Sequence, residues 1–183
     1  MTINIIGDSH CLLYNGVTPH WLNGSTAHNI WKNNKNIETI FRNSYGEVWL
    51  GFGWVDCQRH IYGLQEDIEL PYQFIVEQTV AQYTHYIAYL RNKFTHVITK
   101  VMDVPPAGFE DNIYSILHYP TRDIIHQITI YFNSCLKKEA SRLCIPYVEI
   151  WGEYENPWPE EDFKEDKAHI KNDIATTRLG RWK

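Results

Sequence analysis

The sequence predicts an α/β fold with a mostly parallel sheet of about five strands and helices on both faces. Short apolar runs rich in β-branched residues alternate with longer segments whose apolar residues recur every three or four positions. The chain has 183 residues, enough for one domain with its own hydrophobic core. Because no repeat or change in composition divides the chain, we expect a single domain over residues 1–183.

The expected strands are short apolar runs that end at glycine, proline or polar residues. The first covers residues 3–6 and stops at Gly7, as a buried central strand would. The other expected strands cover residues 36–41, 47–52, 95–101 and 145–150.

Two long helices are expected between these strands. Apolar residues spaced by four and three positions line one face of residues 76–94, and the same pattern recurs over residues 124–143. Thr121 is a suitable N-cap for the second helix. A short terminal helix is expected over residues 170–179. Strands alternating with helices of this length favour parallel pairing, which places ligands at the carboxyl ends of the strands.

Composition and charge narrow the function classes. The net charge is −5 and 44% of the residues are hydrophobic, as in ordinary globular proteins. The lack of a basic patch argues against a nucleic-acid partner. No apolar run is long enough for a membrane span or a signal peptide, and the four cysteines lack disulfide-framework spacing. We therefore expect a cytoplasmic location.

The first strand leads into Gly7-Asp8-Ser9-His10, which a short helix can follow. A serine at such a sharp strand-to-helix turn exposes its hydroxyl above the edge of the sheet. Its backbone N–H lies at a helix N-terminus, where developing negative charge is favoured. This geometry suits a nucleophile that also contributes to an oxyanion hole.

Asp166-Lys167-Ala168-His169 lies near the other end of the chain. A nucleophilic serine needs a base, and the base needs a carboxylate that orients it. The three-residue spacing allows Asp166 to bind one ring nitrogen of His169 while the other faces Ser9. Each piece alone is common as a turn or helix start, but their joint occurrence after the first and last strands favours a catalytic set.

These two segments resemble the first and last sequence blocks of the SGNH (GDSL-like) hydrolases. The resemblance implies a flavodoxin-like three-layer α/β/α sandwich over the whole chain. It also implies a serine esterase that uses no metal or cofactor. On this resemblance Ser9 is the nucleophile, His169 the general base and Asp166 its orienting carboxylate.

The middle blocks of the family are less complete here. Residues 21–27 are similar to the second block, which makes Gly24 the candidate for a second oxyanion-hole N–H beside that of Ser9. A plain Asn-Gly turn is the alternative interpretation of Gly24. The third block normally ends in an Asn-Asp pair, but Val55 occupies the Asn position before Asp56 and has no side-chain donor.

The segment from Phe52 to Ile61 also resembles a bacterial subgroup with a GDSH first block and a Gly-x-x-Asp-Cys third block, in which that Asn is likewise absent. We expect Trp54, Asp56 and His60 to contribute to substrate binding there. Loss of one oxyanion-hole donor lowers the rate by about 100- to 1,000-fold, so the sequence predicts real but modest activity.

The expected substrate is a small-molecule or carbohydrate acyl ester. The chain holds 7 Trp and 12 Tyr, and several of these aromatic residues fall in loops expected near strand ends, where they could stack on a sugar. The ones to test are Trp21, Trp54, Tyr154 and Trp158.

Two alternative functions stay open. Val55 in place of Asn favours a binding or accessory protein that keeps the fold with little catalysis. Asp8-x-His10 after a first strand also opens the metal-dependent phosphoesterases, but their later Gly-Asn-His and Gly-His-x-His clusters are absent from the sequence.

Overall fold

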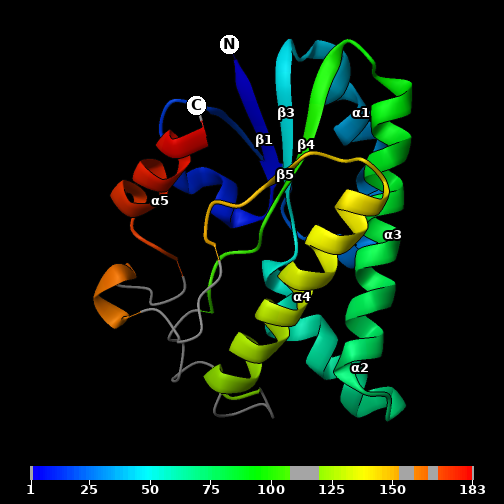
Figure 1. Ribbon diagram of the computed structural model, residues 1–183, viewed down its shortest axis with the longest axis vertical. Helices are drawn as coiled ribbons and strands as arrows, with labels where there is room; N and C mark the ends of the chain where they lie inside the picture. Colours follow the sequence, from blue (N-terminus) through cyan, green and yellow to red (C-terminus); the bar gives the residue numbers. More distant parts are fainter. Residues whose placement is uncertain (1, 108–119, 153–158, 165–168, 183) are drawn as a thin grey trace.

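The computed structural model describes residues 2–107, 120–152, 159–164 and 169–182 (Figure 1). Five parallel strands form one sheet in the order β2-β1-β3-β4-β5. The strands are β1 (Ile3–Gly7), β2 (Thr18–Trp21), β3 (Gly46–Gly51), β4 (Val97–Met102) and β5 (Tyr147–Val148). The predicted α/β fold with a parallel sheet is confirmed.

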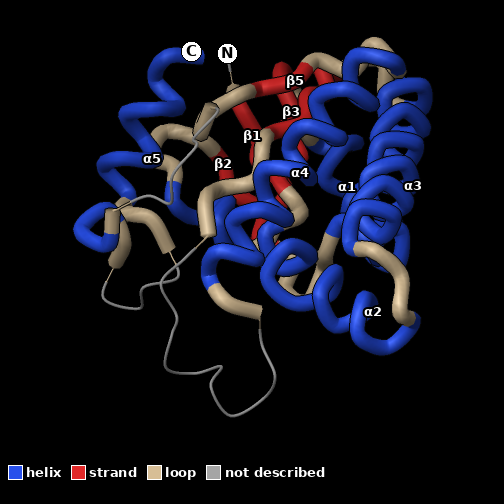
Figure 2. Tube along the Cα trace, turned by 60° about the horizontal axis from the view of Figure 1, so that its bottom comes forward, coloured by secondary structure: helices blue, strands red, loops and turns tan. Residues whose placement is uncertain are grey.

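Helices cover both faces of this sheet and make a three-layer sandwich (Figure 2). The α-helices are α1 (Asn34–Asn43), α2 (Ile61–Ile68), α3 (Tyr72–Lys93), α4 (Arg122–Arg142) and α5 (Asn172–Leu179). The long helices α3 and α4 pack against each other and, with α1, cover one face. Helix α5 packs on the opposite face. Among the described residues, no helix is both long and apolar enough to cross a bilayer.

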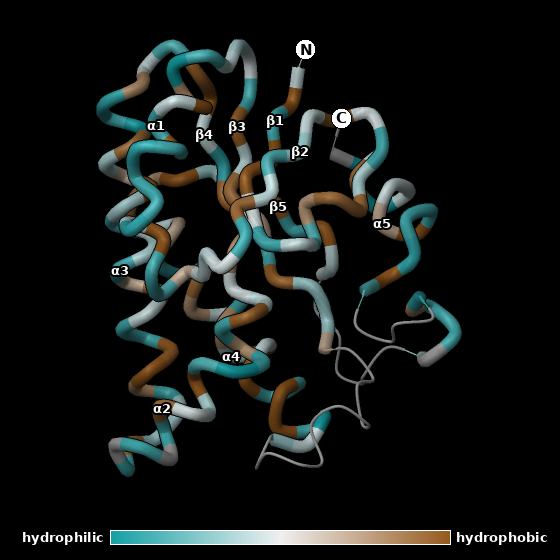
Figure 3. Tube along the Cα trace, turned by 180° about the vertical axis from the view of Figure 1, so that it is seen from behind, coloured by the Kyte–Doolittle hydropathy of each residue, from teal (hydrophilic) through white to brown (hydrophobic). Residues whose placement is uncertain are grey.

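Alternating side chains of the central strands supply both hydrophobic cores. Val48 and Leu50 of β3 join the core beneath α1, α3 and α4, whereas Trp49 between them points to the core beneath α5. All three side chains are fully buried. Hydrophobic segments accordingly concentrate along the strands, and hydrophilic segments lie on the outer turns (Figure 3).

The expected helices are confirmed with small shifts of their ends. The predicted apolar face of α3 is buried, including Val76, Val80, Tyr83, Ile87 and Leu90. Thr121 caps α4, since its side chain accepts a hydrogen bond from the backbone N–H of Ile124.

One strand prediction was wrong, and one strand was not predicted. The segment predicted as a strand over residues 36–41 lies in helix α1, where Ile37 and Phe41 occupy adjacent turns of one buried face. The unpredicted strand is β2, the edge strand over Thr18–Trp21. This strand has no apolar run because three of its four side chains are exposed, and its proline is tolerated at a sheet edge.

The carboxyl ends of three neighbouring strands are level with one another. Gly7 at the end of β1 pairs with Gly51 of β3 on one side and with Trp21 of β2 on the other. Only glycine fits at position 7, because a Cβ there would lie 2.5 Å from the carbonyl oxygen of Gly51. Chemistry-bearing residues that follow these strands are thus collected at one edge of the sheet.

Candidate active site

Ser9 follows directly from the end of β1. Asp8 caps the short 3-10 helix η1 (Ser9–Leu13), and its carboxylate oxygen Oδ1 accepts a hydrogen bond from the backbone N–H of His10 at 3.1 Å. The Asp8 side chain is buried, whereas Ser9 is partly exposed. The cap therefore fixes the turn that presents the Ser9 hydroxyl at the sheet edge.

The structure brings His169 to Ser9 across 160 residues of sequence. Nε2 of His169 lies 2.7 Å from Oγ of Ser9, within hydrogen-bond distance. This is the distance at which an imidazole can take the proton of a serine hydroxyl. Asp166, the expected orienting carboxylate, lies outside the described residues.

His169 lies next to a short antiparallel bridge between residues 163 and 170. Phe163 pairs with Ile170, and both side chains are buried in the core beneath α5. The carbonyl oxygen of His169 accepts a hydrogen bond from the N–H of Lys164 at 2.8 Å, and that of Asp162 accepts one from Lys171 at 3.0 Å. These contacts anchor the backbone of His169 just before α5.

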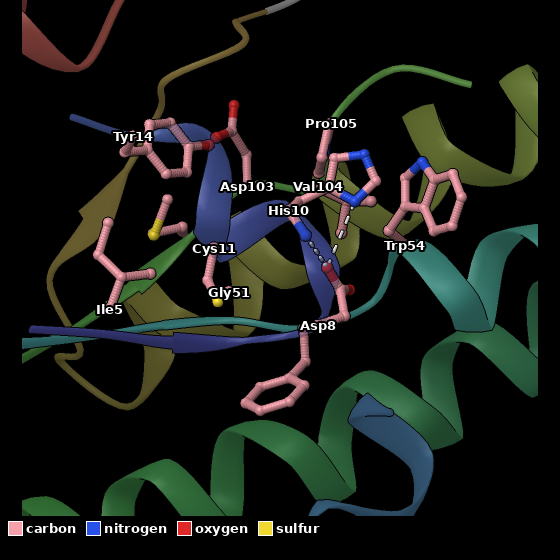
Figure 4. A pocket seen from close by; sticks show the side chains of 12 residues that line it. Ile5, Asp8, His10, Cys11, Tyr14, Gly51, Trp54, Asp103, Val104 and Pro105 are labelled. Atoms are coloured by element: carbon pink, nitrogen blue, oxygen red, sulfur yellow. Dashed lines mark hydrogen bonds and ion pairs between the residues drawn. The ribbon is translucent and has the colours of Figure 1, made fainter. Parts of the chain in front are cut away.

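Two further aromatic rings pack beside the Ser9–His169 pair. The ring of His10 lies 4.8 Å from that of His169, and the ring of Trp54 lies 4.4 Å from His10 and 5.8 Å from His169, measured between centroids. Figure 4 shows His10 and Trp54 side by side above Asp8, with Pro105 nearby on the segment that follows β4. Trp54, one of the expected substrate-binding residues, is 9% exposed and packs on the two histidines.

Asp56 is fully buried and binds backbone rather than ligand. Its carboxylate accepts hydrogen bonds from the N–H groups of Ala27 at 2.7 Å and His28 at 3.1 Å. Burial raises the pKa of Asp56, an effect that the two N–H donors and the nearby His60 oppose. The buried carboxylate thus has a structural role in place of the expected contact with substrate.

The hydrogen bonds of Asp56 anchor the segment that contains Gly24. Ala27 and His28 open the 3-10 helix η2 (Ala27–Asn33), directly after the turn at Gly24. That turn is closed by a hydrogen bond from Ser25 N–H to the carbonyl of Leu22, and Leu22 N–H binds the carbonyl of Gly7. Gly24 has a φ of +74°, which glycine adopts readily.

Val55 and His60 lie in the segment that connects β3 to α2. Val55 is partly buried and packs against the core, so its position is filled by an apolar side chain. His60 ends the π-helical turn η3 (Asp56–His60) and is partly buried close to Asp56. Val55 therefore contributes to the core, and His60 lies near the buried Asp56 carboxylate.

Asp103, which follows β4, was not among the predicted site residues. Its buried carboxylate accepts hydrogen bonds from the N–H groups of Ile150, Trp151 and Gly152 at 2.9, 2.8 and 3.2 Å. Burial raises the pKa of Asp103 to about 7 against the opposing effect of these donors. An acidic residue directly after a predicted strand was the signal that could have found it.

A small cavity joins Asp103 to the site. It is lined by side chains that include Asp8, His10, Tyr14, Trp54, Asp103 and Pro105 (Figure 4). Within the part of the chain that the structure describes, no group of three or more His, Cys, Asp or Glu side chains could hold a metal ion. The described residues thus offer no ligand set for the dinuclear centre of a phosphoesterase.

Comparison with known proteins gives matches in structure and none in sequence. The sequence matches no protein-family model and no curated protein. A GDSL-like lipase from Bacteroides thetaiotaomicron aligns with a TM-score of 0.66 at 16% identity, covering 99% of this chain and 86% of that chain. A lipase/acylhydrolase from Enterococcus faecalis aligns with a TM-score of 0.60 at 12% identity, covering 100% and 95%.

A carbohydrate acetylesterase from Sinorhizobium meliloti aligns with a TM-score of 0.64 at 9% identity, covering 99% of this chain and 95% of that chain. Each of these likenesses extends over essentially the whole chain at low identity. The chain therefore has the α/β/α fold found in GDSL-like lipases and related ester hydrolases.

Proposed function

We propose that this protein is a serine esterase in which Ser9 is the nucleophile and His169 the general base. The 2.7 Å separation between Ser9 Oγ and His169 Nε2 is the observation that carries the proposal. Asp166 precedes His169 by three residues, and we assign it as the carboxylate that orients the imidazole. The fold shared with known ester hydrolases supports the same reaction class.

The reaction would proceed through an acyl-enzyme. Ser9 Oγ attacks the ester carbonyl carbon while its proton passes to His169 Nε2. The resulting tetrahedral intermediate then expels the alcohol, which takes the proton from His169. Water, activated by the same imidazole, attacks the acyl-serine and releases the acid. The two half-reactions restore Ser9 and neutral His169.

The negative charge of the tetrahedral intermediate needs hydrogen-bond donors. We assign the backbone N–H of Ser9, at the start of η1, and that of Gly24 to this oxyanion hole. Asp56 supports the second donor because it anchors the segment after Gly24. Val55 supplies no side-chain donor, so we expect turnover about 100- to 1,000-fold below that of an esterase with a complete hole.

We propose a short acyl ester on a carbohydrate as the substrate. Trp21 supports this choice, because its side chain is 50% exposed at the carboxyl end of β2, opposite Gly7 in the sheet register. An exposed indole at the same edge of the sheet as the nucleophile is a suitable stacking surface for a sugar ring. Tyr154 and Trp158, the other expected stacking residues, lie outside the described residues.

Covalent labelling separates the esterase from a binding protein of the same fold. A fluorophosphonate probe should modify wild-type protein at Ser9, as located by peptide mass spectrometry, and should not modify His169→Ala. Ser44, a buried serine, offers an internal control within the same digest. An unmodified Ser9 in folded protein would favour the accessory-protein function to which Val55 points.

A further inference from the structure

The ring of His169 rests on an aromatic wall formed by His10 and Trp54. The His169 and Trp54 rings are 5.8 Å apart with an interplanar angle of 24°, so the imidazole lies nearly parallel to the indole. The His10 ring is tilted by 30° from His169 and by 47° from Trp54. Each ring thus contacts the other two.

The rings of this aromatic wall are shielded from water, and the backbone that leads into Trp54 is tightly packed. Trp54 is 9% exposed and His10 is 3% exposed, so little water screens the faces that meet His169. Gly53 fixes the backbone that leads into Trp54, since its φ is +129° and a Cβ there would lie 2.7 Å from Cγ2 of Val104. A cation within about 6 Å of an indole centroid is attracted to the ring, most strongly when water is excluded.

We propose that Trp54 is a positioning residue that keeps His169 facing Ser9 and stabilises the positive charge that His169 gains during catalysis. This inference rests on the proposed esterase function. When Ser9 Oγ bonds to the acyl carbon, its proton moves to His169 Nε2 and the imidazole becomes a cation. The indole faces that cation until the proton leaves with the alcohol.

Several charged groups share the surroundings of His169. The carboxylate of Asp8 lies 3.4 Å from Nδ1 of His10. Among the described residues, Asp103 lines the same cavity as His10 and Trp54. The turn η3 adds Asp56, Arg59 and His60, and Lys164 binds the carbonyl of His169. Asp166, the proposed orienting carboxylate, precedes His169 by three residues. A substitution at Trp54 alone leaves all of these groups in place. A change in the titration of His169 would therefore result from the loss of the indole.

NMR of ¹⁵N-histidine-labelled protein can follow this titration without any substrate. The His169 signal is assigned by its loss in His169→Gln, and His10→Asn removes the neighbouring titration. We expect Trp54→Leu to lower the midpoint pH of the His169 titration by about 0.4 to 1.5 units, because the protonated ring loses its partner. Trp54→Phe, which keeps an aromatic face, should retain most of the wild-type midpoint.

Activity gives a second reading of the same substitution. The kcat for a p-nitrophenyl ester should fall by about 2- to 30-fold in Trp54→Leu, and the acidic limb of the pH profile should move with the NMR midpoint. Trp31→Leu is a matched control, since Trp31 is 58% exposed on η2. Trp54→Met, whose flexible side chain adapts to an irregular space, replaces Trp54→Leu if the latter does not fold.

An unchanged His169 midpoint in a folded Trp54→Leu protein would overturn the inference. An equal shift in Trp54→Phe would also overturn it, because the aromatic face would then not be the cause. Absence of turnover in wild-type protein, with the midpoint shift present, would instead remove the esterase function and leave the effect of Trp54 on His169 standing.

Discussion

The carboxylate of Asp56 holds the backbone N–H of Ala27 at 2.7 Å and so joins the end of β3 to the turn that follows β2. The same carboxylate binds the N–H of His28, and none of it is exposed to water. One buried side chain thereby connects two of the segments that surround Ser9. Removing one of its acceptor oxygens should loosen the turn at Gly24.

We expect Asp56→Asn to destabilise the protein by about 1–3 kcal/mol, because an amide NH2 would face a backbone N–H that has lost its acceptor. Esterase kcat should also fall, since the Gly24 donor would be less well placed. Urea unfolding and p-nitrophenyl acetate kinetics measure the two effects. Asp67→Asn, on the exposed surface of α2, should change neither, and an equal effect in both variants would contradict the role of Asp56.

A substitution at Gly53 tests the packing of the backbone that leads into Trp54. An alanine there would adopt an unfavourable positive φ and push its Cβ to 2.8 Å from a ring carbon of Phe132. We expect Gly53→Ala to lower the free energy of unfolding by about 2–4 kcal/mol and Tm by about 5 to 15 °C. Thermal unfolding followed by circular dichroism measures this.

Gly63→Ala is the matched control for that substitution. Gly63 lies within α2 and a Cβ there meets no atom within 4 Å, so alanine should leave Tm unchanged or raise it slightly. If Gly53→Ala is as stable as Gly63→Ala, the segment before Trp54 is not fixed as described.

The raised pKa of Asp103 predicts that the free energy of unfolding depends on pH. Its pKa is raised to about 7 by burial, compared with about 3.9 in an unfolded chain. The folded state therefore binds the proton more tightly, and this contribution to stability is complete below about pH 4. It is lost as the pH rises toward 7, by up to about 1.4 kcal/mol for each pH unit.

Urea unfolding at several pH values between 4 and 8 measures this loss. The difference in unfolding free energy between wild type and Asp103→Asn should change across that range, because the variant cannot titrate there. The same difference for Asp173→Asn, an exposed carboxyl in the first turn of α5, should stay nearly constant. A constant difference for Asp103→Asn would show that this carboxyl titrates at its ordinary pH.

Trp21 tests the class of substrate. Trp21→Ala should raise KM for an acetylated oligosaccharide by about 2- to 10-fold, the effect of losing one aromatic stacking contact. KM for p-nitrophenyl acetate, which has no sugar, should be unaffected. The exposed Trp31 again supplies the control substitution. Equal changes for both esters would argue against sugar stacking at Trp21.

Local patterns were sufficient for the central part of the fold. The apolar runs of β1, β3 and β4 and the helical spacing of α3 and α4 follow from burial, which the sequence displays directly. The edge strand β2 was not predicted, because a strand with mostly exposed side chains needs no apolar run. Strand β5 ends at Val148, earlier than expected, because the N–H of Ile150 binds the Asp103 carboxylate instead of a neighbouring strand.

Within the candidate site, residue type combined with position along the chain was enough to select the Ser9–His169 pair. Ser9 and His169 were chosen because a Gly-Asp-Ser-His turn and an Asp-x-x-His pair follow the first and last strands, and the structure places the two side chains in contact. The packing of His10 and Trp54 on His169 depends on how three distant segments meet, and no spacing in the sequence encodes that. The burial of Asp56 was missed for the same reason.

The most direct test of the central claim is the kcat/KM for p-nitrophenyl acetate of wild-type protein and Ser9→Ala, measured side by side. We predict measurable turnover by wild-type protein and its complete loss in a folded Ser9→Ala variant, because the hydroxyl beside His169 forms the acyl-enzyme. Turnover retained in Ser9→Ala would contradict the assignment of Ser9 as the nucleophile.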